Sequence, residues 1–72
     1  MEFIPVENSS NLRGVHYEPN TQTLTVQFKS GTYEYKDVPV DTYTGLLNAD
    51  SKGKYMNQNV IGKFESKKLA AQ

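Results

Sequence analysis

The alternation of apolar and polar residues is most regular between Leu24 and Tyr35, where the sequence reads Leu-Thr-Val-Gln-Phe-Lys-Ser-Gly-Thr-Tyr-Glu-Tyr. Alternation with a period of two is typical of strands that bury one face. The Ser30-Gly31 pair in the middle is a two-residue turn signal, and Gly31 can supply the positive φ that such a turn requires. The pattern therefore predicts a β-hairpin.

The turn also predicts how the two strands of this hairpin are paired. With Ser30-Gly31 as the loop, the pairs are Phe28 with Tyr33 and Val26 with Tyr35 on the core face, and Gln27 with Glu34 and Thr25 with Lys36 on the outer face. A slip of one residue would mix apolar and polar side chains on both faces. We therefore expect the first four residues to be mostly buried, and Gln27 and Glu34 to be exposed.

A further strand is predicted before the hairpin, at residues 13–17, and residues 18–21 form a turn signal that contains Pro19. If Tyr17 opposes Leu24, then Val15 opposes Val26, and apolar residues again face apolar residues. The result is a three-stranded antiparallel meander with one apolar face. Its outer face carries Gly14, His16, Thr23, Thr25, Gln27, Thr32, Glu34 and Lys36.

The period changes after Pro39, and helical spacing replaces alternation. Val40, Tyr43, Leu46 and Leu47 predict a helix at residues 39–48, with Pro39 tolerated in its first turn. Ser51 can cap a second short helix. Residues 52–64 fit either a helix or an extended segment, with Gly62 as a break. The predicted fold class is α+β: a three-stranded antiparallel β-meander followed by one or two short helices packed on one sheet face.

Length and composition set the limits within which such a fold must work. The 72 residues correspond to a single domain, for which we expect a folded part at 9–65 and flexible ends at 1–8 and 66–72. The chain contains no Cys and a single histidine, His16, so neither a disulfide framework nor a multi-histidine or thiolate zinc site is expected. No cofactor is predicted.

The chain start and the distribution of charge bear on location and partners. Residues 1–6 are acidic and interrupted by Pro5, unlike a secretory signal, and no stretch has transmembrane length, so we expect a cytoplasmic protein without a membrane partner. The net charge is zero, but residues 1–50 carry three basic and seven acidic residues, whereas residues 51–72 carry five lysines and one glutamate. Such asymmetry indicates either a basic face for an anionic partner or a solvated tail.

The spacing of several residues resembles that of a known family. The residues are Ser10-Asn11-Leu12, Tyr17, Leu24-x-Val26-x-Phe28-x-x-Gly31-x-Tyr33-x-Tyr35-x-x-Val38-Pro39 and Tyr43-x-x-Leu46-Leu47-x-Ala49-x-Ser51-x-Gly53-x-Tyr55-x-Asn57. Over about residues 9–64, this pattern is similar to the KTSC domain, named after the C-terminus of some lysyl-tRNA synthetases and also found in small bacterial and phage proteins. The resemblance implies no established activity, and it suggests RNA binding through the attachment to a synthetase.

Two modes of RNA binding can be weighed against the sequence. Tyr33 and Tyr35 resemble a base-stacking platform on a sheet. The predicted register opposes this mode, because it places both tyrosines on the face that the helix covers. The second mode uses a helix start, where free N–H groups and the helix dipole favour an anion. Its candidate residues for RNA, a small nucleotide or a phosphate are Ser51, Lys52, Gly53, Lys54, Asn57 and Lys63.

Other functions are weighed on the same evidence. No motif places a nucleophile beside a base, and His16 falls on the polar sheet face, so we expect no catalytic residues and no enzyme. The alternative to an anion-binding module is a protein-interaction or adaptor domain, because a three-stranded sheet leaves two unpaired edges. Residues 3–4 and 60–64 are candidates to cover those edges within the molecule. If they do not, a partner chain or a weak homodimer is expected, and otherwise a monomer.

Overall fold

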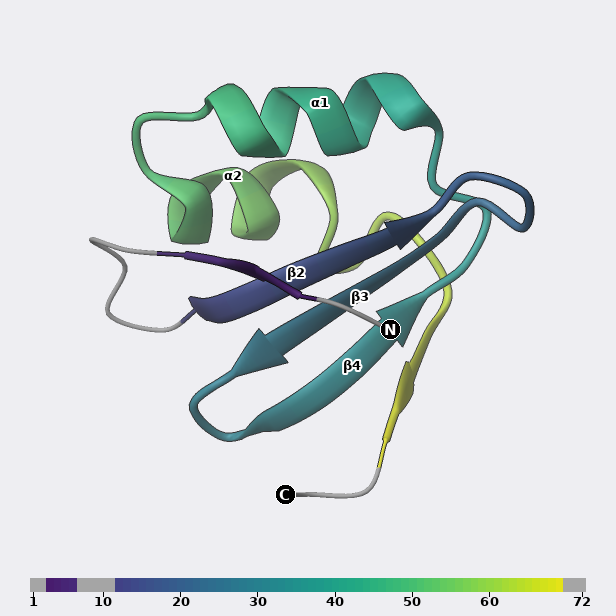
Figure 1. The fold of residues 1–72 in the computed structure, drawn as a ribbon, viewed down its shortest axis with the longest axis horizontal. Coiled ribbons are helices and arrows are strands. Elements are labelled where there is room, and N and C mark those ends of the chain that lie inside the picture. Colours follow the sequence, from purple (N-terminus) through teal and green to yellow (C-terminus); the bar gives the residue numbers. More distant parts are fainter. Residues whose placement is uncertain (1–2, 7–11, 70–72) are drawn as a thin grey trace.

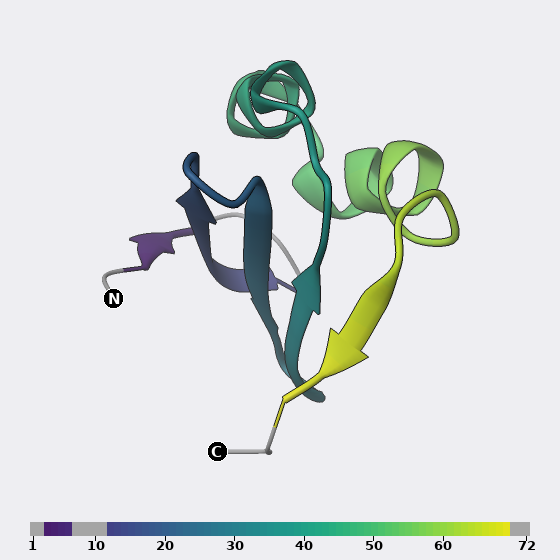
Figure 2. The same cartoon turned by 90° about the vertical axis from the view of Figure 1, so that its right-hand side faces the viewer.

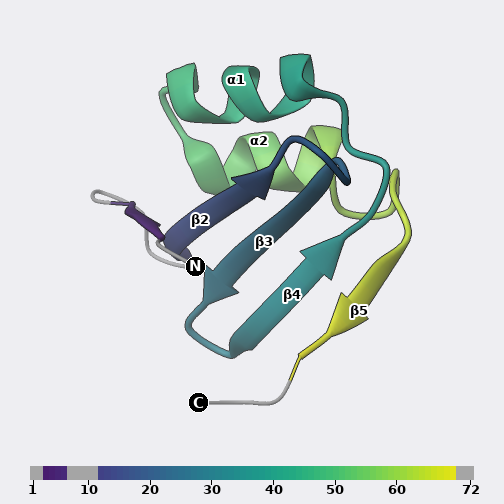
Figure 3. The same cartoon turned by 45° about the vertical axis from the view of Figure 1, so that its right-hand side comes forward.

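Three long strands form the centre of an antiparallel sheet, and two helices pack on one of its faces. The computed structural model describes residues 3–6 and 12–69. The strand order is β1-β2-β3-β4-β5, and Figures 1 and 3 show both helices on the same side of the sheet. The predicted α+β class is thereby confirmed. The elements are β1 (Ile4–Pro5), β2 (Leu12–Glu18), β3 (Thr23–Phe28), β4 (Gly31–Tyr35), α1 (Val40–Asn48), α2 (Lys52–Asn59) and β5 (Ser66–Lys68).

Two short outer strands extend the predicted meander to five strands. β1 pairs with β2, with Ile4 opposite Val15, and β5 pairs with β4, with Lys68 opposite Tyr33. The N-terminal segment thus covers one edge as expected, but the other edge is covered by 66–68 rather than by 60–64. Of the ends expected to be flexible, residues 3–6 and 66–69 lie along the sheet, and the remaining residues of 1–8 and 66–72 lie outside the described residues.

The pairing of β2 with β3 follows the predicted register. Tyr17 lies opposite Leu24 and Val15 opposite Val26, and the chain turns between Glu18 and Thr23. The register shifts between Leu12 and Gly14, so that β2 contains a β-bulge at its start. This bulge was not predicted, because the predicted strand began at residue 13 and left out Leu12, whose spacing of three from the buried Val15 departs from alternation.

The predicted register of β3 with β4 is wrong by two residues. The loop consists of Lys29 and Ser30, Phe28 lies opposite Gly31, and Val26 lies opposite Tyr33. A shift of two residues keeps every side chain on its face, so alternation cannot distinguish the two registers. The observed register places the bulky Phe28 opposite a residue without a side chain. Gly31 was predicted as a loop residue but is the first residue of β4, where its φ is 149°.

The helices begin close to the predicted positions. α1 starts one residue after Pro39, and Ser51 caps α2, where its Oγ accepts a hydrogen bond from the Lys54 backbone N–H. Residues 52–59 are therefore helical, and Gly62, with a φ of 81°, lies in the turns that follow. The core between sheet and helices consists of Leu12, Val15, Leu24, Val26, Tyr35, Val38, Leu46, Met56 and Val60.

Burial differs from the prediction at the hairpin and on the outer face. Phe28 and Tyr33 are only half-buried, because the loop end of the β3–β4 hairpin projects beyond α1 (Figures 1 and 2). On the outer face, Gln27 and Glu34 are half-buried rather than exposed, and Thr25 is 1 % exposed at the centre of the sheet. Thr25 lies between the longer side chains of His16 and Glu34 on the adjacent strands. The outer face is therefore less exposed than its polar residues alone predicted.

Candidate functional site

Two of the predicted site residues serve the junction between the helices. Ser51 Oγ is 3.4 Å from the Lys54 backbone nitrogen, and Lys52 Nζ donates to the Ala49 carbonyl oxygen at 3.3 Å. That carbonyl lies just past the end of α1, where a cation is electrostatically favourable. In this arrangement, Ser51 and Lys52 already have partners within the protein.

The remaining lysines of the predicted site lie at the two ends of α2. Lys54 is in the first turn, whereas Lys63 follows the helix, and both are exposed. A helix of eight residues is about 12 Å long. The structure therefore does not bring Lys54 and Lys63 to one point, although a ligand that extends along α2 could reach both.

Gly53 and Asn57 line a groove that the sequence did not reveal. Across from these residues, the groove is lined by Phe28, Lys29 and Ser30 of the β3–β4 hairpin, and Ile61 completes the lining of a cavity of about 300 Å³. Gly53 and Asn57 are one helical turn apart and therefore share a face of α2. The helix start thus contributes to a site whose other wall comes from a distant part of the chain.

A second cavity continues this groove along the helix-facing side of the sheet. It has a volume of about 320 Å³ and shares Phe28, Ser30 and Ile61 with the first. Its other lining residues are Tyr33, Tyr35, Gly62 and Ser66. We refer to the two joined cavities as the tip groove. Among the described residues that line it there is no Asp or Glu.

An aromatic pair lies in the tip groove. The rings of Phe28 and Tyr33 meet edge to face, with centroids 5.6 Å apart and planes at 80°. Lys68 lies opposite Tyr33, and an ideal Cβ at Gly31 would be 3.4 Å from its Cε. The aliphatic stem of Lys68 therefore lies beside Gly31 at the start of β4. This wall was not predicted from the sequence, because Phe28 and Tyr33 were expected to be mostly buried on the core face.

Deeper in the groove, burial changes the ionisation of a tyrosine. Desolvation raises the pKa of Tyr35, and the neighbouring Tyr33 raises it further. Burial likewise raises the pKa of Tyr43, whose ring stacks on Tyr17 with centroids 4.7 Å apart. Both phenols are consequently neutral at physiological pH and act as packing groups with a hydroxyl.

His16, the single histidine of the chain, lies on the outer face of the sheet. His16 is half-buried rather than fully exposed, because the Phe3 ring lies against it with centroids 6.1 Å apart. Within the described residues, no three His, Asp or Glu side chains gather where they could hold a metal ion. In the same part of the chain, neither helix has the length and apolar character needed to cross a membrane.

Comparison with known proteins places these features in a family. A model of the KTSC domain matches residues 8–64. A lysine–tRNA ligase of Nostoc sp. is 44 % identical over 62 residues, which is 85 % of this chain and 11 % of the ligase. An uncharacterised protein of Stutzerimonas stutzeri is 47 % identical over 51 residues, or 69 % of this chain and 72 % of that protein.

A solved structure extends the similarity to three dimensions. The crystal structure of a KTSC domain protein from Yersinia pestis matches with a TM-score of 0.92 and 33 % identity, and the match covers 96 % of this chain and 97 % of that one. This chain spans only about a tenth of the length of the lysine–tRNA ligases that it matches. Sequence pattern, fold and matched residues agree, and the chain belongs to the KTSC domain family.

Proposed function

We propose that this domain is a non-catalytic module that binds single-stranded RNA, or a nucleotide of it, in the tip groove. One observation carries the proposal. Gly53 and Asn57, which belong to the segment Ser51–Lys63, share a groove with the hairpin residues Phe28 and Lys29, and none of its described lining residues is acidic. Such a groove combines an apolar group, a cation and an amide, which can contact the base and the phosphate of a nucleotide.

The aromatic pair supplies the contact with the base. Phe28 and Tyr33 are half-buried and line the groove from one side. A base that stacks on an aromatic side chain gains about 1–3 kcal/mol. A volume near 300 Å³ is at the lower end of ligand sites, which suits one nucleotide and excludes a duplex.

Lysines supply the contact with the phosphates. Lys29 lines the groove, and the exposed Lys54 follows Gly53 in the first turn of α2. The relatives that carry a domain of this kind include lysine–tRNA ligases, which supports RNA as the anionic partner. Binding to phosphates releases counterions, so the affinity should fall steeply as the salt concentration rises.

The test is the affinity of the protein for a labelled single-stranded RNA, measured by fluorescence anisotropy over a salt series. We expect Lys29→Glu combined with Lys54→Glu to abolish binding without changing the melting temperature appreciably. The matched control is Lys36→Glu combined with Lys67→Glu, because Lys36 follows the opposite end of β4 and Lys67 pairs with Glu34 on the outer face. Binding that ignores salt, or that survives the first double change, would contradict the proposal.

A protein partner is the second candidate, and an exposed side chain favours it. Ile61 is 41 % exposed beside the half-buried Phe28, so the groove carries an apolar rim. Self-association through this rim would appear as a dimer in light scattering. The dimer should be lost in Ile61→Asp and retained in Lys29→Glu combined with Lys54→Glu, whereas RNA binding should be lost in that double variant.

A further inference from the structure

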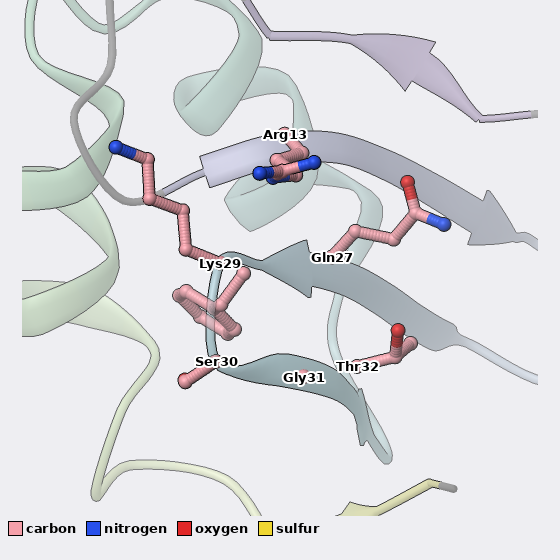
Figure 4. Close-up of a pocket in the computed structure, with 7 residues that line it drawn as sticks. Arg13, Gln27, Lys29, Ser30, Gly31 and Thr32 are labelled. Atoms are coloured by element: carbon pink, nitrogen blue, oxygen red, sulfur yellow. The ribbon is translucent and has the colours of Figure 1, made fainter. Parts of the chain in front are cut away.

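The hairpin tip has a second cavity on the outer side of the sheet, away from the helices. It has a volume of about 300 Å³ and is lined by Arg13, Gln27, Phe28, Lys29, Ser30, Gly31 and Thr32. Figure 4 shows side chains from β2, β3 and β4 around it, with Arg13, Gln27 and Thr32 on adjacent strands. We call this cavity the outer tip pocket. It shares Phe28, Lys29 and Ser30 with the tip groove.

The β-bulge in β2 explains why Arg13 lines this pocket. Leu12 lies opposite Phe28 and Gly14 opposite Gln27, so Arg13 is the extra residue between two paired positions. A bulge redirects the side chain of such a residue relative to regular alternation. The Arg13 carbonyl oxygen accepts a hydrogen bond from the Val6 backbone nitrogen at 3.0 Å, which fixes its backbone, while the side chain is exposed.

The two cations of the pocket lack partners within the described part of the protein. There, neither the Arg13 guanidinium nor the Lys29 ammonium forms a salt bridge or a side-chain hydrogen bond. The described residues that line the pocket include no carboxylate, and they add the amide of Gln27 and the hydroxyls of Ser30 and Thr32. The pocket therefore offers donors of several geometries and two positive charges to a ligand.

We propose that the outer tip pocket binds a phosphate group. The planar fork of arginine matches the oxygens of a phosphate, lysine adds a point charge, and short hydroxyl and amide donors can meet the remaining oxygens of the tetrahedral group. A carboxylate has only two oxygens in one plane and would leave several of these donors unused. Both a terminal phosphate monoester and a backbone phosphodiester share the chemistry that the pocket recognises.

This site does not rest on the proposed RNA binding in the tip groove, because Arg13, Gln27 and Thr32 line the outer tip pocket and not the groove. Lys29 lines both. The test is a titration of the protein with inorganic phosphate at constant ionic strength, in which the backbone amide resonances are followed by NMR. We expect saturable shifts confined to residues 13 and 27–32. Arg13→Gln and Lys29→Gln should each weaken binding about tenfold, since each removes a charge-assisted hydrogen bond. Lys36→Gln, at the far end of β4, should leave the affinity unchanged.

Two further titrations distinguish the source of the phosphate. Stronger binding of a nucleoside 5′-monophosphate than of a dinucleotide phosphodiester would assign the pocket to a terminal phosphate, and equal binding would assign it to the backbone. Shifts that do not saturate, that are matched by acetate or chloride, or that saturate at the same phosphate concentration in Arg13→Gln as in the wild type would overturn the proposal. Arg13 is exposed, so this variant should fold, and an unchanged amide spectrum in α1 and α2 verifies that it does. Arg13→Gln separates the two proposals, because Arg13 lines only the outer tip pocket and RNA binding in the tip groove should survive this variant.

Discussion

Gly45 of α1 lies in direct contact with Tyr55 of α2. An ideal Cβ at position 45 would overlap the Tyr55 hydroxyl and would lie 2.9 Å from the ring carbon Cζ. The same hydroxyl donates to the Thr42 carbonyl oxygen at 3.0 Å. The two helices can approach this closely only because residue 45 has no side chain.

Gly45→Ala is therefore expected to destabilise the protein, contrary to its usual effect in a helix. Alanine is normally better than glycine in a helix by about 1 kcal/mol, but overpacking costs about 1–3 kcal/mol. Urea unfolding should show a loss for Gly45→Ala. The control is Thr44→Ala, an exposed position of the same helix, which should be neutral or slightly stabilising. A gain in stability for Gly45→Ala would show that the helices can separate without cost.

A hydrogen bond ties β2 to the segment that leads into α1. Tyr17 Oη donates to the Val38 carbonyl oxygen at 2.6 Å, in a partly buried position. We expect Tyr17→Phe to lower the free energy of unfolding by about 1–2 kcal/mol, because the acceptor loses its partner and stays partly buried. Tyr33→Phe is the matched control, since the described structure gives its hydroxyl no hydrogen bond. Equal losses in chemical denaturation would refute a specific role of this bond.

The fold could be predicted from the sequence because the spacing of its apolar residues changes at Pro39 from alternation to a helical period. Alternation identified the meander and the register of β2 with β3, and helical spacing identified α1 to within one residue. The register of β3 with β4 could not be fixed in the same way. Whether Phe28 pairs with Tyr33 or with Gly31, each side chain stays on the face that alternation gives it. Only the space available around Phe28 distinguishes the two registers.

The candidate site was less predictable, because its walls come from segments far apart in the chain. Gly53 and Asn57 could be selected from a helix start, but their groove depends on the β3–β4 loop lying near α2. Arg13 had no signal of its own in the sequence, since its place in the outer tip pocket follows from a bulge. Local sequence patterns do not show which distant segments of the chain come into contact in the fold.

The two burial levels at the hairpin make a quantitative prediction. Leu24 is fully buried, whereas the larger Phe28 is half-buried at the groove. We expect Leu24→Ala to cost about 2–5 kcal/mol, a large share of the stability of a small domain. Phe28→Ala should cost less than Leu24→Ala, because part of its surface is already in water. Chemical denaturation of both variants measures this order, and a greater loss for Phe28→Ala would mean that the groove is closed in solution.

The raised pKa of Tyr35 predicts how stability depends on alkaline pH. The phenol has a higher pKa in the folded state, through burial and the neighbouring Tyr33, than its ordinary value of about 10 in the unfolded chain. Above that value the unfolded state releases its proton while the folded state keeps it. The stabilising contribution is therefore complete below about pH 10 and is lost as the pH rises toward the pKa of the folded state.

The measurement is the free energy of unfolding by urea between neutral and alkaline pH, in the wild type and in Tyr35→Phe. Lysines and the other tyrosines also titrate in this range, so the comparison with the variant isolates Tyr35. We expect the decline above about pH 10 to be shallower in Tyr35→Phe, because phenylalanine has no proton to lose. Tyr43→Phe should flatten the profile as well, since burial also raises the pKa of Tyr43. If the wild type and Tyr35→Phe decline in parallel, the Tyr35 hydroxyl must ionise as readily in the folded protein as in the unfolded chain, and the buried position at the end of the tip groove would have to be accessible to water.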